Sequence, residues 1–180
     1  MFLKKFFSLL IFAVILIPTI CLAAEKPKVA VIPFEDKSPK NGVVLENDMD
    51  TTRHDIVEVY LEQTKIFRFA TRTEVDKLMM LISHDENNSF VDSEDVVESG
   101  KMFGVHYLVM GTVNGFKSKK KGDYTAYFSV RMIEVETAEI VYSGSGEGKS
   151  DENMLVALRK AAIDAMNGKR GMLTMMRGRK

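Results

Sequence analysis

The order of apolar and polar positions predicts a strand and then a long helix at the start of the folded part. Residues 28–34 are almost all apolar and are followed by polar residues 35–42, which is typical of a buried strand that leads into a loop. Residues 44–64 carry apolar side chains at steps of three and four, as an amphipathic helix does. The side chains expected to face the core are Leu45, Met49, Ile56, Val59 and Tyr60.

The next pattern predicts a second strand and two shorter helices. Residues 66–70 alternate and are rich in aromatic side chains, as a strand is. Residues 73–82 then carry a helical stripe with acidic side chains in the first turn. After a polar loop at 84–92, Ser93 is suited to begin a short helix that Gly104 ends.

The last third predicts three antiparallel strands and a final helix. Residues 105–116 and 124–136 read as two strands joined by a short polar connection, which predicts a hairpin. A turn at Thr137 and Ala138 leads into a third strand at 139–145. The last helix is expected to begin after Ser150. The core side chains expected on the middle strand and this helix are Tyr124, Ala126, Phe128, Val130, Met132, Met154, Leu158, Ala161, Ala165 and Met166.

The predicted fold class is therefore α+β, in the order β-α-β-α-α-β-β-β-α. It is a five-stranded mixed sheet with a C-terminal antiparallel meander, and helices cover the sheet. The chain has 180 residues, 46% of them hydrophobic and 28% charged, which suits one ordinary domain, placed at 25–167. The charges of the 25 basic and 25 acidic residues cancel, so the protein as a whole has no positive electrostatic field that would attract nucleic acid.

The first 24 residues have the pattern of a secretory signal peptide. Two lysines precede an apolar run, and small residues precede Glu25. Cleavage after Ala23 or Ala24 would place the domain in the periplasm. The mature domain would have no thiol, because Cys21 is the one cysteine in the chain. The alternative is a lipid anchor at Cys21, which Ile20 disfavours because lipoprotein cleavage needs a small residue at that position.

Two basic segments are the candidate interaction sites. One is the hairpin connection with Lys119, Lys120 and Lys121, which is either a solvated tip or a contact for an anionic partner. The other is the methionine-rich tail at 168–180, which is either a frayed end or a cover for an apolar or lipid surface. Its candidate contact residues are Lys169, Arg170 and Arg177.

Enzymatic chemistry finds no support in the sequence, and we expect no catalytic residue, no cofactor and no metal. Residues 143–150 end in Gly-Lys-Ser like a phosphate-binding loop, but Ser143 stands where the first glycine belongs and Glu147 would face the phosphate. We interpret them as a flexible strand end followed by a helix N-cap. His54 and His84 have acidic neighbours but no recognised metal spacing, and His106 is expected to be a hydrogen-bonded structural residue.

Four segments carry a resemblance to a known family. Residues 29–36, 66–72, 100–111 and 130–141 resemble successive blocks of the CsgG/LpoB family, although Ala138 stands where a glycine is usual. Members include the curli secretion channel and a lipoprotein activator of peptidoglycan synthases. The resemblance implies a periplasmic, non-catalytic domain that works by contact with other proteins.

Two functions follow from this resemblance. The first is an exported adaptor or regulator of cell-envelope assembly that binds envelope proteins, with self-association and a peripheral contact with the outer membrane left open. The alternative is a soluble accessory component of an outer-membrane secretion or surface-organelle assembly, curli-like or flagellar. The partner protein is not identified by the sequence.

Overall fold

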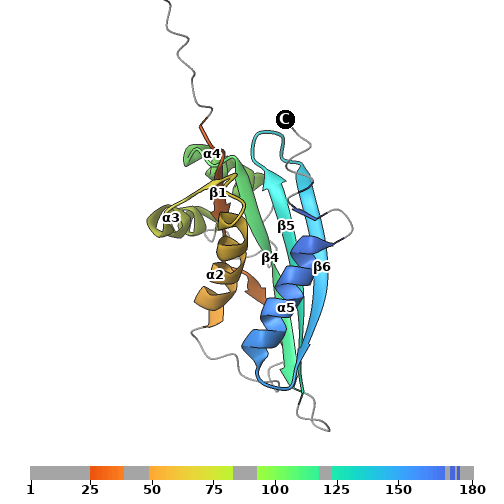
Figure 1. Ribbon diagram of the computed structural model, residues 1–180. Coiled ribbons are helices and arrows are strands. Elements are labelled where there is room, and N and C mark those ends of the chain that lie inside the picture. Colours follow the sequence, from red (N-terminus) through yellow and green to blue (C-terminus); the bar gives the residue numbers. More distant parts are fainter. Residues whose placement is uncertain are drawn as a thin grey trace, which may run out of the picture.

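A mixed sheet with helices on both faces forms the domain (Figure 1). The computed structural model describes residues 25–38, 49–82, 93–117, 123–168, 171, 172 and 174. The signal peptide, the loop at 84–92 and the first residues of the predicted long helix lie outside this part of the chain. The α+β class and the order of elements are confirmed.

The sheet has six strands, one more than the sequence predicts. Its strands are β1 (Lys28–Val31), β2 (Glu35–Asp36), β3 (Arg68–Phe69), β4 (Tyr107–Lys117), β5 (Tyr124–Glu134) and β6 (Ile140–Ser150). They run in the order β3-β1-β4-β5-β6, and β2 pairs with β4 further along the same edge as β1. Pairings of β1 with β3 and β4 are parallel, whereas β4, β5 and β6 form the predicted antiparallel meander.

The extra strand comes from residues that the sequence places in a loop. Glu35 pairs with Thr112, and the Lys37 amide donates to the Val113 carbonyl at 2.8 Å. Both β2 side chains are exposed, so no apolar alternation announces the strand. It forms because the open edge of β4 offers backbone partners beyond the end of β1.

The helices pack in two pairs, one on each face of the sheet. They are α2 (Met49–Glu62), α3 (Arg72–Ile82), α4 (Ser93–Met102) and α5 (Met154–Asn167). Val29 and Val31 of β1 join the core with α2 and α5, while Ala30 and Ile32 join the core with α3 and α4. Residues 29–32 are thus buried on both faces, which explains their continuous apolar run.

The predicted inner face of α2 is partly wrong. Val59 is 53% exposed, whereas Val57 and Leu61, which the sequence does not single out, are fully buried. Ile56 and Tyr60 are partly buried against the core, as expected. The helix is therefore rotated from the predicted orientation.

Residues 143–150 are strand, not the predicted flexible end. They pair with β5 through Ser150, and their three glycines face α5. A side chain on Gly144, Gly146 or Gly148 would collide with the α5 backbone, so helix and strand lie in direct contact there. The five predicted core residues of α5 are all buried, with Ala157 and Ala162 beside them.

The N-cap of α5 also differs from the prediction. Asn153, not Ser150, caps the helix, and its side-chain oxygen accepts from the Val156 amide at 2.9 Å. Ser150 remains paired in β6 and accepts from the Glu152 amide instead. The strand extends to Ser150 because its glycines give the helix room to return across it.

Two tyrosines hold the C-terminal end of α5. The Tyr142 hydroxyl donates to the Ala165 carbonyl at 2.5 Å, and the Tyr60 hydroxyl donates to Asn167 Oδ1 at 2.7 Å. Burial raises the pKa of both hydroxyls above the usual value. Met172 follows and is fully buried in the same core, so this part of the tail covers an apolar surface, in agreement with one of its two interpretations.

Candidate binding hollow on the sheet

One half of the sheet carries polar side chains on the face opposite α5. Met110, Thr112 and Asn114 of β4 lie across from Arg131, Ser129 and Tyr127 of β5. No helix that the structure describes packs on this half, since α3 and α4 cover the end of the sheet that includes Leu108 and Ile133. Polar alternation on these strands therefore belongs to an open sheet face.

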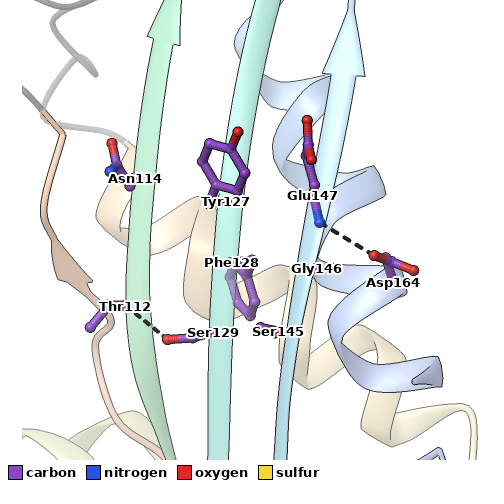
Figure 2. A pocket seen from close by; sticks show the side chains of 9 residues that line it. All are labelled: Thr112, Asn114, Tyr127, Phe128, Ser129, Ser145, Gly146, Glu147 and Asp164. Carbon is purple, nitrogen blue, oxygen red and sulfur yellow. Dashed lines mark hydrogen bonds between the residues drawn. The ribbon is translucent and has the colours of Figure 1, made fainter. Parts of the chain in front are cut away.

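A hollow of about 360 Å³ lies on this open face (Figure 2). Thr112, Ser129 and Ser145 bring hydroxyl groups from three adjacent strands. Glu147 of β6 and Asp164 of α5 bring carboxylates. The size lies near the lower end of small-molecule sites, roughly 300–1,000 Å³.

One hydrogen bond fixes two of the three hydroxyl groups in the hollow. Thr112 Oγ1 and Ser129 Oγ lie 2.8 Å apart and share one hydrogen bond. These two residues are direct cross-strand partners, so the register of β4 and β5 sets their distance. A ligand would meet hydroxyls that are already oriented.

Asn114 and Tyr127 form a second cross-strand pair in the hollow. Tyr127 is 43% exposed, so a face or edge of its ring meets solvent. Asn114 Oδ1 is buried and has no hydrogen-bond partner among the described residues. A buried acceptor of this kind costs free energy as long as no donor reaches it.

The free edge of β6 closes the acidic side of the hollow. Asp164 Oδ2 accepts from the Glu147 amide at 3.3 Å, and Lys160 Nζ donates to the Lys149 carbonyl at 3.0 Å. Lys149 Nζ also lies 2.7 Å from Glu147, and this hydrogen bond raises the pKa of the lysine. Side chains of α5 thus satisfy backbone groups that an edge strand would otherwise offer to another chain.

A separate charged cluster lies where β1, α3 and α4 meet. Lys28 Nζ lies 2.6 Å from Glu74 and donates to the Phe103 carbonyl at 3.1 Å. The same carboxylate accepts from the amide and hydroxyl of Thr71, which begins α3 in a capping box. The contact with Lys28, followed by those with Thr71, lowers the pKa of Glu74 to about 2.

His106 belongs to this structural cluster. Its Nδ1 accepts from the Lys28 amide at 3.1 Å, and its own amide donates to the Lys28 carbonyl at 2.8 Å. The predicted hydrogen-bonded structural role is confirmed. Among the described residues, no group of three or more histidine, cysteine, aspartate or glutamate side chains is arranged to hold a metal ion.

The six basic residues predicted for interaction lie outside the described part of the chain: Lys119, Lys120, Lys121, Lys169, Arg170 and Arg177. The residues that flank the two segments are described, and they lie at opposite ends of α5. Tyr124 pairs with Ser150 near the start of this helix, and Gly168 follows its last residue. A helix of 14 residues separates the two positions by about 20 Å.

The sequence pattern does not reveal the hollow. The alternation along residues 124–132 puts Thr125, Ser129 and Arg131 on the face opposite Phe128 and Val130, but no signal marks that face as uncovered. Glu147 stands out in the sequence only as an obstacle to phosphate binding, and Tyr127 carries no predicted role. The alternation of polar residues in β5 and β6 is the signal that could have found them.

Comparison with known families identifies the domain. The profile of the family described as peptidoglycan-synthase activator LpoB matches residues 47–147, which is more than half of the chain. The chain belongs to the LpoB family. The matched residues extend from before α2 into β6 and include most of the hollow. No finding supports the CsgG half of the resemblance.

Several solved structures are similar to this LpoB-family domain. The PelC dodecamer from Paraburkholderia phytofirmans is similar with a TM-score of 0.51 at 14% identity, over 77% of this chain and 85% of that one. Lipoprotein GNA1162 from Neisseria meningitidis gives 0.50 at 15% identity, over 84% and 93%. The LpoB C-terminal domain from Escherichia coli gives 0.49 at 13% identity, over 68% and 82%.

Two further findings concern the sequence and the described helices. No curated protein sequence matches it. None of the described helices has both the length and the apolar content that crossing a bilayer requires.

Proposed function

We propose that this LpoB-family domain is an exported, non-catalytic regulator that binds a peptidoglycan synthase of the cell envelope. The observation that carries the proposal is the family match over residues 47–147, because the family is described as an activator of these synthases. The signal-peptide pattern of residues 1–24 supports export to the periplasm, with a lipid anchor at Cys21 as the alternative.

The side chains of the described residues support a binding role over a catalytic one. The hollow holds two carboxylates, but Glu147 is paired with Lys149 and Asp164 accepts from a backbone amide. The charged cluster of Lys28 and Glu74 is occupied by contacts that join β1 to α3. A catalytic role would require one of these charged side chains to transfer a proton. A regulator needs only a surface that is complementary to its partner, so these paired side chains are compatible with binding.

The basic segments are our proposed contacts with the partner. In the sequence, Lys119, Lys120 and Lys121 lie between β4 and β5, and Lys169, Arg170 and Arg177 come after α5. Complementary charge speeds association and fixes orientation more than it adds affinity. The described residues that flank the two segments lie at opposite ends of α5, so we expect the segments to meet different patches of the partner.

An assay of glycan-chain synthesis tests the proposal. It measures the rate of a purified peptidoglycan synthase of the same cell, with and without this protein. We expect the protein to raise the rate and to co-purify with the synthase after crosslinking in cells. A triple variant, Lys119→Glu, Lys120→Glu and Lys121→Glu, should weaken capture, and a tail variant with Lys169→Glu and Arg170→Glu serves as the comparison. If the rate is unchanged and no synthase is crosslinked, the proposal is wrong.

Self-association is a separate proposal. The similar PelC structure is described as a dodecamer, and a self-assembling regulator would present several copies of its binding surface. Light scattering of the purified protein at several concentrations tests it. A monomer mass at every concentration would contradict self-association and would leave the synthase assay unaffected.

A further inference from the structure

We propose that the hollow formed by β4, β5, β6 and Asp164 binds a neutral oligosaccharide. It is distinct from the basic segments proposed to contact a protein partner, and it consists of described residues throughout. The inference rests on the side chains that line the hollow and does not depend on synthase activation.

The chemistry of the lining matches a sugar ring. Hydroxyls of Thr112, Ser129 and Ser145 both donate and accept, and the carboxylates of Glu147 and Asp164 accept. Each hydroxyl of a sugar can donate to one of these oxygens and accept from another. Tyr127 adds an exposed aromatic ring among them, against which the C–H face of a sugar can pack (Figure 2).

Asn114 provides an independent observation that points to a ligand. Its Oδ1 is buried, it lines the hollow, and it has no partner among the described residues. Buried polar atoms almost always take part in a hydrogen bond, with protein or with ordered water. Because this oxygen is itself buried, a sugar hydroxyl that donates to it requires the Asn114 side chain to turn toward the hollow.

The charge of the lining selects a neutral ligand. Among the described residues that line the hollow there is no lysine or arginine, while there are two carboxylates. An anionic saccharide would therefore meet like charge without a balancing cation in the lining. Lys149, which is paired with Glu147 at 2.7 Å, lies beyond the lining residues.

The same lining is a poor centre for a protein interface. The centre of such an interface is enriched in aromatic residues, methionine and arginine and depleted in serine, glutamate and aspartate. Here one tyrosine stands among hydroxyls, an amide and two carboxylates. The composition therefore favours a hydroxylated small molecule over a protein surface.

Two-dimensional NMR of the labelled protein tests the inference with defined probes. Chitotetraose and cellotetraose are the neutral probes, and tetragalacturonate is the anionic probe. We expect at least one neutral tetrasaccharide to shift the amide signals of Tyr127, Ser129 and Ser145 with saturation, and the anionic one to bind at least tenfold more weakly. A response to chitotetraose alone would assign the N-acetyl group a role.

Variants separate binding from folding. Tyr127→Ala should weaken binding at least tenfold, whereas Tyr127→Phe keeps the ring and should change it less than threefold. Asn114→Ala should weaken binding several-fold without lowering the melting temperature of the free protein, because the removed oxygen has no partner there. Ile140→Ala is the control, since this side chain is 56% exposed on β6 outside the hollow.

Several outcomes would overturn the inference. The first is that neither neutral probe causes saturable shifts up to about 10 mM, a concentration above the millimolar range of weak sites. The second is that the shifts are confined to residues outside the hollow. The third is that Tyr127→Ala binds the sugar as well as the unaltered protein does. A synthase that protects Tyr127 and Ser145 from exchange while neither neutral sugar binds would reassign this face to the protein partner. Sugar binding without synthase activation would leave this inference standing and contradict only the proposed function.

Discussion

Lys28 Nζ lies 2.6 Å from Glu74 Oε1, and this ion pair joins the first strand of the sheet to the first turn of α3. The lysine side chain is only 11% exposed, and its ammonium also donates to the Phe103 carbonyl beyond α4. One cation therefore links three elements that are far apart in the sequence. Removing its partner would leave a nearly buried charge without a carboxylate.

We predict that this pair makes the stability of the domain depend on pH in the acidic range. Its contacts lower the pKa of Glu74 from 4.5 to about 2, so the carboxylate binds its proton less readily in the folded state. The resulting contribution is fully present above pH 4.5 and is lost as the pH falls toward 2. Urea unfolding from about pH 2 to 7 measures this contribution to the free energy of unfolding. The proteins to compare are the unaltered protein, Lys28→Gln, Glu74→Gln and the double variant.

The coupling energy of that double-mutant cycle decides the outcome. It should favour folding at pH 7 and approach zero near pH 2, because protonated Glu74 no longer attracts Lys28. A coupling energy that stays constant across the range would show that the ion pair is not the source of the shift.

The glycines of β6 lead to the second prediction. A Cβ atom on Gly146 would collide with the carbonyl oxygen of Ala161, and one on Gly148 with that of Ala157. Gly146→Ala should therefore push α5 away from the sheet and lower the free energy of unfolding by about 1–3 kcal/mol. Ser145→Ala, one residue away on the opposite face, should change it by less than about 0.5 kcal/mol.

Chemical denaturation of the two variants measures the difference. Equal stability of Gly146→Ala and Ser145→Ala would mean that α5 does not rest directly on the strand. The melting temperature of Gly148→Ala provides an independent second position, because its Cβ would meet the Ala157 backbone.

This strand shows why part of the fold is hidden from the sequence. Three glycines within five residues look like a loop, because glycine is unfavourable in a strand and common in turns. Their spacing of two places them all on one face, but only the presence of α5 across that face gives the spacing a meaning. The pattern of α5 correctly predicts that its alanines are buried, yet it does not identify their partner.

The strands and helices with strong periodicity could be predicted, and the orientation of α2 could not. Ala126, Phe128, Val130 and Met132 alternate without exception and are all buried. In α2, by contrast, Val57, Val59 and Leu61 are all apolar, so the pattern allows more than one buried face. Packing against β1 and α5 selects Val57 and Leu61.

The hollow could not be predicted from the sequence, because it depends on which part of the sheet face the helices leave uncovered. The sequence shows that Ser129 and Arg131 point away from the core side, but a polar strand face can be solvated, covered or part of a site. Among the described elements, α3 and α4 cover one end of this face and none packs on the other end, and this placement is known only from the structure. The unpartnered oxygen of Asn114 is likewise a property of packing.

A third prediction concerns the hydroxyl of Tyr142. It donates to the carbonyl of Ala165, one of the last four residues of α5, whose carbonyls have no partner within the helix. Tyr142→Phe should lower the free energy of unfolding by about 1–3 kcal/mol, because a buried acceptor loses its donor. Tyr60→Phe is the control, since its bond to Asn167 is exposed and water can replace it. Similar losses in the two variants would contradict the buried role of Tyr142.

The last prediction concerns the turn between β5 and β6, where Ala138 has a φ of 60°. This left-handed conformation brings Cβ close to the backbone in any residue except glycine. Ala138→Gly should therefore raise the free energy of unfolding by up to about 1 kcal/mol, since relief of strain exceeds the added freedom of the unfolded chain. Chemical denaturation of the two proteins measures the change.

Two further glycine substitutions show whether the gain comes from the backbone. Lys65 has a φ of 56° at the end of the turn after α2, so Lys65→Gly should also stabilise. Lys77→Gly in the middle of α3 should instead destabilise by about 1 kcal/mol, because glycine is unfavourable within a helix. If Ala138→Gly lowers stability as Lys77→Gly does, the turn is held by contacts of the Ala138 methyl group and not strained by it.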